Sequence, residues 1–338
     1  MTMSKLLEAA MRAAVVVQDE GGKRIEVRDV PRPQPGAGEV LVRVHAAGAN
    51  RADLAMNVGH FKQAGAALAA PVAGLEFAGE VAELGAGVSG VKAGDRVMAM
   101  GQGAFAQYAR IDHRLLIPVP TGFSWEEAAS APVAFMTMHD AVVTNGRLHH
   151  GESVLVQGVT SGVGIAAFQI AKAKGAGLVI GTSTSDAKLA TLRGWGLDVG
   201  VNSLSDDVVR RVTESTGGRG ADLVIDMIGG PVVNQNMQAA AVKGRIVDVG
   251  RLGGLKGEID LDLHSLKRIS FVGVTFRTRS LEEIQTIIRL MVDDIWPHVV
   301  AGRVKVPIDR SFPLEQAAGA YAHMRANAHL GKVVLTIA

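Results

Sequence analysis

A glycine-rich turn interrupts the segment Ser153–Gly175 (SVLVQGVTSGVGIAAFQIAKAKG) where an apolar strand pattern changes into a helical pattern. Glycine permits the tight turn and lets the backbone approach a ligand closely. The N–H groups and the positive dipole end of the following helix attract an anion. This context predicts a site for the pyrophosphate of a dinucleotide, whereas the alternative is a glycine-rich turn that binds nothing. The residues expected to bind the cofactor are Gly158, Ser161, Gly162, Val163 and Gly164.

The end of the next apolar strand distinguishes NAD from NADP. NAD-binding proteins usually place an acidic residue there, about 20 residues after the glycines, to hold the ribose hydroxyls. Here Thr182, Thr184 and Ser185 stand at that end, and Lys188 follows within one helical turn. Asp186 is the nearest acid, but it is expected to begin a helix, where acidic residues are common. Hydroxyls and a cation suit a 2′-phosphate, so the sequence predicts NADP(H), although Thr184 and Ser185 could simply cap the helix.

The elements that would position this turn alternate between strand and helix from about residue 125 onward. Near-continuous apolar strands separated by helices are typical of a parallel sheet that is covered on both faces. This pattern predicts an α/β fold with a doubly wound parallel sheet. The expected strands are 154–156, 179–182, 199–202, 223–227, 246–249 and 269–276.

The chain before about residue 113 has a different pattern, with short strands separated by glycine and proline. The segment Pro31–Glu39 (PRPQPGAGE) is a clear break between strands. Short strands at this spacing predict a β-barrel or a β-sandwich. A helical turn is expected at Asn50–Met56, an amphipathic helix at Leu281–Val300 and a final strand at Val333–Ile337. The expected early strands are 13–17, 24–30, 40–45, 77–84, 95–98 and 105–111.

The composition is that of a globular chain. Its 338 residues predict two domains, and 48% hydrophobic with 20% charged residues exclude a disordered chain. The formal charge of +2, with scattered lysines and arginines, predicts neither nucleic acid nor a membrane as a partner. Without a long apolar run or a secretory signal, a cytoplasmic protein is expected, with residues 1–10 as a frayed extension or a non-native addition. Cysteine is absent, which excludes disulfides, cysteine nucleophiles and thiolate metal sites.

Several segments beyond the glycine turn carry further motifs: GANRADLAMNVGHF (48–61), PVAGLEFAGEVAELGAGV (71–88), KAGDRVMAM (92–100), GADLVIDMIGG (220–230), KGRIVDVG (243–250) and HLGKVVLTI (329–337). Together they resemble the medium-chain dehydrogenase/reductase superfamily, in its zinc-independent, zeta-crystallin-like quinone oxidoreductase branch. The resemblance implies a Rossmann NADP(H)-binding domain (132–277) inserted into a GroES-like catalytic domain (11–131, to which 278–338 return). It also implies a homodimer through the outer strand of the Rossmann sheet, at residues 271–276.

Zinc-dependent members of the superfamily bind their catalytic metal with a cysteine, a His-Glu pair and a further cysteine. By the resemblance, Asn50 stands at the first ligand position and Leu75 at the histidine position, while Glu76 is retained. An amide and an aliphatic side chain cannot complete a tetrahedral zinc site. The sequence therefore predicts an enzyme that works without a metal.

The resemblance also implies roles for individual residues. Asn50 and Asp53 would lie beside the nicotinamide as catalytic residues, and Thr137 would contact the cofactor near the same ring. A purely structural hydrogen bond is the alternative for Asp53, and an ordinary helix hydroxyl is the alternative for Thr137. Further cofactor contacts are implied for Asn202, Gly250, Arg251, Phe276 and Lys332.

Reduction without a metal requires a substrate that is already electrophilic. A quinone fits, because its carbonyls are conjugated and its oxygens can take protons from water, so hydride transfer depends mainly on orientation. Related enone and enoyl-thioester reductases often use a tyrosine as proton donor, and Phe61 stands at that position, while Tyr108 and Tyr321 are expected to pack. The sequence predicts an NADPH:quinone oxidoreductase. The alternatives are an NADPH-dependent reductase of enones or other activated double bonds, and a nucleotide-binding, crystallin-like protein of low activity.

Overall fold

The computed structural model describes residues 10–19, 22–55 and 71–338, so Phe61 lies outside the described residues. The chain forms two compact units: residues 1–133 with 306–338, called here the split unit, and residues 134–305, called the inserted unit. The chain leaves the inserted unit at residue 305, later than the predicted boundary at 277. The reason is that helix α10 (Leu281–Val300) packs against α5 (Gly162–Ala173) of the inserted unit.

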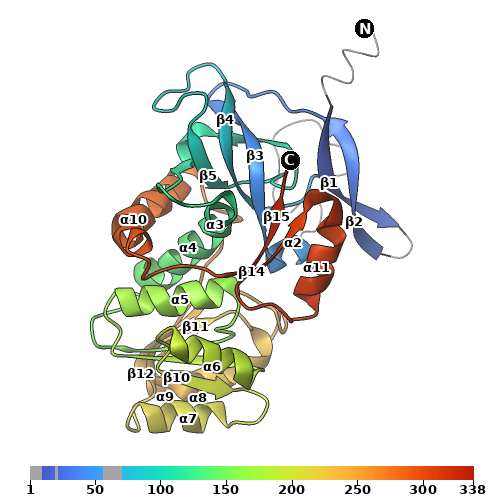
Figure 1. The fold of residues 1–338 in the computed structure, drawn as a ribbon. Coiled ribbons are helices and arrows are strands. Elements are labelled where there is room, and N and C mark those ends of the chain that lie inside the picture. The colour runs from blue at the N-terminus through green and yellow to red at the C-terminus, as the bar shows by residue number, and fades with distance from the viewer. Residues whose placement is uncertain (1–9, 20–21, 56–70) are drawn as a thin grey trace, which may run out of the picture. The chain divides into compact units, whose positions relative to one another are not determined.

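Six parallel strands form the sheet of the inserted unit, in the order β10-β9-β8-β11-β12-β13. Strands β10, β11 and β12 of this sheet are labelled in Figure 1. Counted along the chain from β8, this is the order 3-2-1-4-5-6 that dinucleotide-binding sheets adopt, so the predicted doubly wound parallel sheet is confirmed. The strand order reverses between β8 and β11, and ligands of such sheets bind outside the carboxyl ends at this point. The strands are β8 (Ser153–Val156), β9 (Leu178–Ser183), β10 (Val199–Asn202), β11 (Ala221–Asp226), β12 (Ala240–Asp248) and β13 (Ser270–Gly273).

Helices pack on this sheet through buried aliphatic side chains such as Leu155, Ile180 and Val224 of the strands and Val212 and Met237 of the helices. The last strand is shorter than expected, since β13 ends at Gly273 and pairs with β12 alone. Besides α5 and α10, the inserted unit contains most of α4 (Pro132–His139), a π-helix (Asp140–Asn145), α6 (Asp186–Gly194), α7 (Val208–Ser215), a 3-10 turn (Gly230–Val232), α8 (Val233–Ala239) and α9 (Leu261–Lys267).

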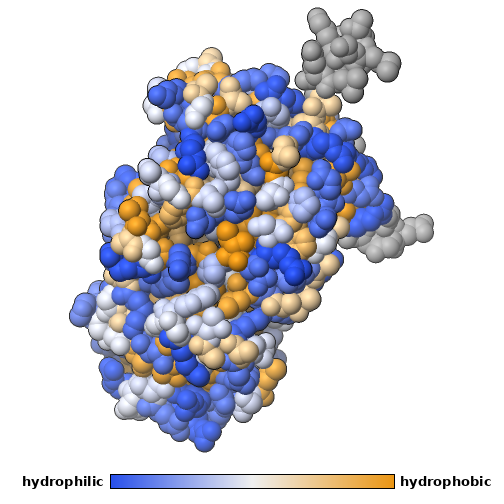
Figure 2. Space-filling view, viewed as in Figure 1, coloured by the Kyte–Doolittle hydropathy of each residue, from blue (hydrophilic) through white to orange (hydrophobic). Residues whose placement is uncertain are grey.

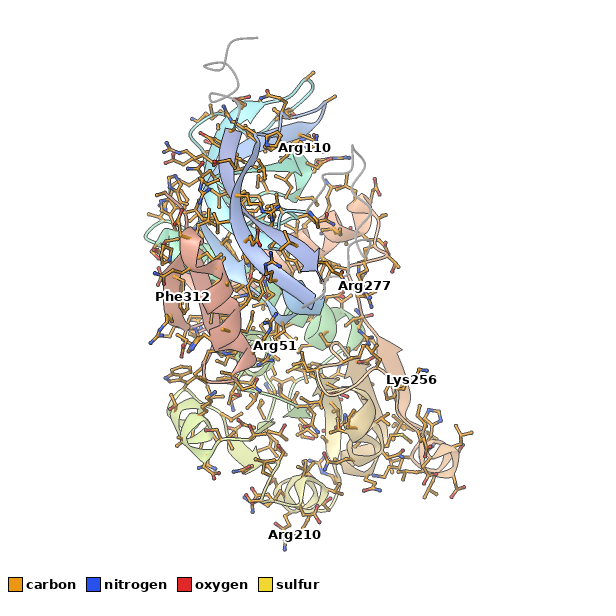
Figure 3. The ribbon with its side chains drawn as sticks, turned by 90° about the vertical axis from the view of Figure 1, so that its right-hand side faces the viewer. Arg51, Arg110, Arg210, Lys256, Arg277 and Phe312 are labelled. Carbon is orange, nitrogen blue, oxygen red and sulfur yellow. The ribbon has the colours of Figure 1, made fainter. Side chains whose placement is uncertain are left out.

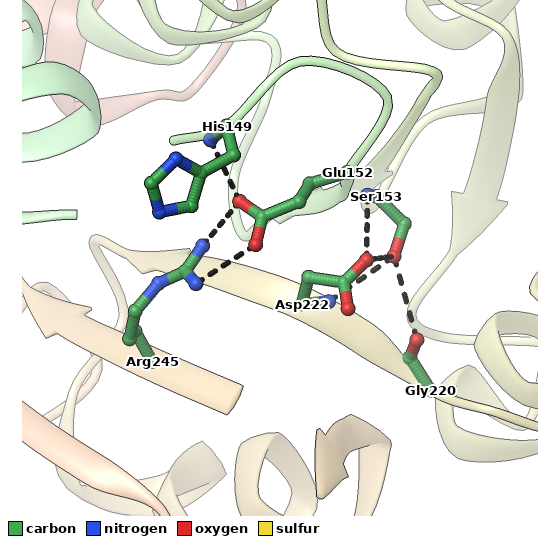
Figure 4. A network of polar contacts seen from close by, with 6 residues as sticks. All are labelled: His149, Glu152, Ser153, Gly220, Asp222 and Arg245. Carbon is green, nitrogen blue, oxygen red and sulfur yellow. Dashed lines mark hydrogen bonds and ion pairs between the residues drawn. The ribbon is translucent and has the colours of Figure 1, made fainter. Parts of the chain in front are cut away.

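A polar network holds the amino-terminal edge of this sheet together (Figure 4). The N–H and the hydroxyl of Ser153 both donate to Asp222 Oδ2, at 2.8 and 2.7 Å. Arg245 of β12 forms a bidentate pair with Glu152, at 2.9 and 2.5 Å, and the His149 N–H donates to the same carboxylate at 2.8 Å. These contacts align the start of β8 with β11 and β12.

Antiparallel pairing dominates the split unit. Strands β1 and β2 form a hairpin, and the larger sheet has the order β14-β15-β3-β4-β5-β7, with β6 also paired to β3. Because β15 pairs with β3, the end of the chain completes a sheet begun by its first fifty residues. The elements are β1 (Ala10–Asp19), β2 (Gly22–Pro31), β3 (Glu39–Ala49), α2 (Arg51–Ala55), β4 (Glu76–Leu84), β5 (Arg96–Met100), β6 (Tyr108–Asp112), a 3-10 turn (His113–Leu115), β7 (Ile117–Pro118), α3 (Trp125–Ser130), β14 (Ile308–Pro313), a 3-10 turn (Leu314–Gln316), α11 (Ala317–Arg325) and β15 (Lys332–Thr336).

The core of the split unit includes Phe77, Phe105 and Tyr321. Arg51, labelled in Figure 3, donates to the Met324 carbonyl oxygen at 3.2 Å and so ties α2 to α11. On the face shown in Figure 2, hydrophobic residues lie among hydrophilic ones. Within the described ranges, no helix is long and apolar enough to cross a membrane.

Candidate cofactor and active site

The glycine turn joins β8 to α5 at the carboxyl edge of the parallel sheet, and its glycines are required by the backbone. Gly158 has a φ of +71°, in the left-handed region that favours glycine. A Cβ on Gly164 would lie 2.5 Å from the Gly158 carbonyl oxygen, so a side chain there would displace the turn. The Ser161 hydroxyl caps α5, accepting from the Gly164 N–H at 3.1 Å and donating to the Gly158 carbonyl at 3.0 Å. The turn therefore presents the positive end of a helix at the place where this sheet type binds ligands.

The end of β9 carries the residues that were expected to distinguish NADP from NAD. Thr184 is exposed, and Ser185 caps α6 by accepting from the Lys188 N–H at 3.4 Å, so the capping role of this serine is real. Asp186 lies in the first turn of α6, where its carboxylate accepts a hydrogen bond from Asn202 Nδ2 at 2.8 Å. The nearest acid is therefore engaged by the neighbouring strand.

Two other predicted cofactor residues lie behind this surface. Thr182 is 2% exposed and its hydroxyl oxygen accepts from the Gly158 N–H at 3.0 Å. Asn202 is also buried, and its amide oxygen accepts from the Leu204 N–H at 3.1 Å. Both side chains fix the backbone that would contact the cofactor.

The loops after β11 and β12 lie against each other at the same sheet edge. The Gly250 N–H donates to the Asp226 carbonyl oxygen at 3.1 Å, and further backbone hydrogen bonds continue between the two loops. Arg251 pairs with Asp248 at 2.7 Å, and Phe276, beyond β13, is half-buried. These two loops are joined by backbone hydrogen bonds and lie beside the glycine turn; together they are called here the platform.

A buried cluster in the split unit contains the predicted catalytic Asn50. The Lys332 ammonium donates to Asn50 Oδ1 at 2.8 Å and to Glu76 Oε1. Asn50 Nδ2 donates to Glu76 Oε1 at 2.9 Å, and the Val133 N–H donates to Glu76 Oε2 at 2.8 Å. Lys332 is 4%, Glu76 0% and Asn50 8% exposed, so the ion pair is held away from water. Lys332, predicted to bind the cofactor, is engaged here by two other side chains.

Asp53 adjoins this cluster, since its Oδ2 accepts from the Asn50 N–H at 2.8 Å. Burial raises the pKa of Asp53 to about 7, and the Glu76 charge adds to this, whereas Lys332 opposes it. Burial, with the nearby Asp53 carboxylate, raises the pKa of the Tyr321 hydroxyl well above its usual value. The structural hydrogen bond considered for Asp53 is therefore present, and its carboxyl group titrates near neutral pH.

The residues at the zinc-ligand positions do not fit a zinc ion. Asn50 and Glu76 already bind the Lys332 ammonium, and Leu75 offers no donor atom. Among the described residues, no group of three or more histidine, cysteine or acidic side chains gathers in a way that could hold a metal.

Other buried polar residues were not identified from the sequence. Gln157, Asn236 and Asp226 form hydrogen bonds behind the glycine turn, and the Ser183 hydroxyl lies 3.3 Å from that of Thr160. Gln157 and Asp226 left a signal, because each is a polar residue at the end of a buried apolar strand. Thr137, the remaining predicted residue, lies half-buried on α4.

Family models match both units of the chain. Residues 36–121 match the alcohol dehydrogenase GroES-like domain, and residues 162–293 match the zinc-binding dehydrogenase model. Rat quinone oxidoreductase is 30% identical over 332 residues, which cover 97% of this chain and 98% of that protein. A phenolphthiocerol/phthiocerol polyketide synthase of Mycobacterium tuberculosis is 34% identical over 331 residues. The match covers 97% of this chain but only 15% of the synthase, so the chain spans a small part of that relative.

Solved structures agree with these relatives. The mycobacterial protein Rv1454c complexed with NADPH has a TM-score of 0.85 at 26% identity, covering 96% of this chain and 99% of that one. A quinone oxidoreductase of Pseudomonas syringae has a TM-score of 0.85 at 25% identity, with 96% and 99% of the two chains covered. Sequence, strand order and these relatives agree: the chain belongs to the quinone oxidoreductase-like branch of the medium-chain dehydrogenase/reductase superfamily, whose members use NAD(P)H.

Proposed function

We propose that the chain is an NADPH:quinone oxidoreductase that works without a metal. The observation that carries this proposal is the glycine turn, which presents the positive end of α5 at the switch point of the parallel sheet. Similarity to rat quinone oxidoreductase over nearly the whole of both chains supports the choice of substrate. NADPH, when bound, supplies the hydride, and the quinol oxygens can take protons from water.

The chain's own residues would then bind and orient the cofactor. The amino-terminal end of α5 would neutralise the pyrophosphate. Lys188, with Thr184 and Ser185, would hold the 2′-phosphate, since Asp186 is engaged by Asn202. We assign Lys332 to the cluster that holds Asn50. The further residues proposed to contact or support the cofactor are Gly158, Ser161, Gly162, Val163, Gly164, Thr182, Gly250, Arg251 and Phe276, with Asn50, Asp53 and Thr137 toward the nicotinamide.

A reductase of activated carbon–carbon double bonds is the second candidate. It is favoured by the 34% identity to the mycobacterial polyketide synthase over 97% of this chain. Both candidates share the hydride donor and differ in the acceptor.

A panel of acceptors tests the two candidates together. We expect NADPH oxidation with ortho- or para-quinones, and the second candidate predicts faster turnover with enones or enoyl thioesters. Absence of turnover with every acceptor would refute both. Lys188→Ala should weaken NADPH binding much more than NADH binding, whereas Lys172→Ala on α5, which loses only its pair with Asp198, should change neither.

We also propose a homodimer through the outer edge of the inserted unit's sheet. Strand β13 pairs with β12 alone, and Phe271 on it is 40% exposed. Leu261 and Leu266 on α9 are 72% and 73% exposed, more than is usual for large aliphatic side chains. An unpaired strand edge with exposed apolar neighbours is suited to pairing with a second copy.

A further inference from the structure

Four buried side chains form an unbroken hydrogen-bonded chain behind the glycine turn. The Thr182 hydroxyl donates to Gln157 Oε1 at 2.7 Å, and Gln157 Nε2 donates to Asn236 Oδ1 at 2.7 Å. Asn236 Nδ2 then donates to Asp226 Oδ2 at 2.9 Å. All four residues are at most 2% exposed, so water cannot replace these bonds. This hydrogen-bonded chain of side chains crosses the sheet where the strand order reverses, from β9 past β8 to β11.

The two ends of this chain hold the two loops of the candidate cofactor site. At one end, the Thr182 oxygen accepts from the Gly158 N–H at 3.0 Å. At the other end, Asp226 Oδ1 accepts from the N–H groups of Ile228 and Gly229, at 2.7 and 3.1 Å. The hydrogen-bonded chain therefore connects the glycine turn to the platform formed by the loops after β11 and β12.

The charge on Asp226 sets the direction of every bond in the chain. An ionised carboxylate only accepts, so Asn236 must turn its Nδ2 toward it and its Oδ1 toward Gln157. Gln157 must then present its Nε2 to Asn236 and its Oε1 to Thr182, which donates its hydroxyl proton. The Thr182 oxygen is left to accept from Gly158 alone, and the aligned dipoles strengthen this last bond.

Protonation of Asp226 would allow the opposite direction. Because Oδ1 accepts two backbone N–H groups, the proton would sit on Oδ2 and donate to Asn236. Both amides would then reverse, and the Thr182 oxygen would accept from Gln157 as well as from Gly158, which weakens its hold on the glycine turn. Burial raises the pKa of Asp226 to about 6, Asp248 adds to this, and backbone and Asn236 donors oppose it. Arg251, the charged group beside them, pairs with Asp248.

We propose that Asp226, acting through Asn236 and Gln157, is a positioning residue for the glycine turn, so that cofactor affinity depends on the direction of this hydrogen-bonded chain. This inference rests on the proposed binding of NADPH at the turn. None of the three residues needs to touch the cofactor, because the effect passes through Thr182 to the Gly158 N–H.

The substitution Asp226→Asn tests the direction of the hydrogen bonds in this chain of side chains without opening a cavity. The new amide would accept from Ile228 and Gly229 through its oxygen and donate to Asn236, which imposes the reversed chain. We expect NADPH to bind about 3–10-fold more weakly at pH 8, the effect of weakening about one hydrogen bond, with no loss of thermal stability because a buried charge is removed. Ser153→Ala is the matched control, because it breaks a buried polar network at the opposite edge of β8 (Figure 4) and should lower stability without changing NADPH affinity.

The ratio of the two dissociation constants, Asp226→Asn over wild type, should fall toward one as the pH drops from 8 to 5. Titration of the 2′-phosphate of NADPH affects both proteins and cancels in this ratio. Equal or tighter binding by Asp226→Asn at pH 8, or a ratio that does not change with pH, would overturn the inference. Amide hydrogen exchange at residues 158–164 of the cofactor-free protein tests this inference independently of the proposed function. Faster exchange in Asp226→Asn supports the positioning role even if wild type fails to bind NADPH, and unchanged exchange overturns it.

Discussion

Replacing Lys332 by methionine should destabilise the split unit, because it removes the cation that faces a fully buried carboxylate. Methionine is similar in length and packs well in irregular spaces, so the change removes the charge with little loss of packing. Glu76 would keep hydrogen bonds from Asn50 Nδ2 and the Val133 N–H, at 2.9 and 2.8 Å. Its charge would have no remaining cationic partner in the cluster.

The magnitude follows from burial. Removing one partner of a buried ion pair costs about 3–5 kcal/mol, because the remaining charge is uncompensated. Two hydrogen bonds persist on Glu76, so we expect about 3 kcal/mol for Lys332→Met. The double variant Lys332→Met/Glu76→Gln removes both charges, and its new amide can still accept from the Val133 N–H. Replacing a whole buried pair with neutral groups is often nearly neutral, so we expect about 1 kcal/mol or less.

Urea unfolding of wild type, both single variants and the double variant measures these costs as a thermodynamic cycle. Because two units need not unfold together, hydrogen exchange in β3 and β15 should show where stability is lost. A cost below about 1 kcal/mol for Lys332→Met would refute the reasoning. So would a double variant whose cost equals the sum of the single variants, since the charges would then not interact.

Three further outcomes follow from the structure. Burial raises the pKa of Asp53 from 3.8 to about 7. Between pH 3.8 and pH 7, Asp53 is protonated in the folded state and ionised in the unfolded state, so folding takes up a proton and the stability of the folded state falls as the pH rises. The free energy of unfolding of Asp53→Asn, measured with urea, should therefore rise relative to that of wild type by up to about 1.4 kcal/mol per pH unit between pH 5 and pH 7. Parallel pH profiles of the two proteins would contradict this. Gly164→Ala should abolish calorimetric NADPH binding because its Cβ would lie 2.5 Å from a carbonyl oxygen, whereas Gly194→Ala, with nothing within 4 Å, should bind normally. Phe271→Asp should convert a dimer into a monomer in light scattering, and Val300→Asp, at a site 70% exposed on another element, should not.

The glycine turn could be predicted from the sequence because its requirements are local. A left-handed φ at Gly158 and a close approach at Gly164 arise within seven consecutive residues. Most of the parallel strands were also predictable, since each contains a short apolar segment such as Val154–Val156 or Leu223–Ile225. The boundary after residue 277 was not, because the position of α10 depends on its contact with α5, more than one hundred residues earlier.

The polar networks could not be predicted for the same physical reason. Lys332 and Glu76 are 256 residues apart and meet only because β15 pairs with β3, which itself pairs with β4. Gln157 and Asn236 are 79 residues apart, and nothing in the sequence indicates that these two amides meet. Their roles depend on which strands become neighbours, which no spacing along the chain encodes.

The retention of Glu76 without metal-binding neighbours has an energetic consequence. A buried carboxylate needs a counter-charge, and here the Lys332 ammonium supplies it from the last strand. Gly48 makes room for the pair, since a Cβ there would lie 2.4 Å from Glu76 Oε1. Restoring ligands through Asn50→Cys and Leu75→His would therefore not create a zinc site while Lys332 remains, because the ion would have to enter beside a fixed positive charge. The change of ligands and the buried lysine are thus coupled parts of one charge balance.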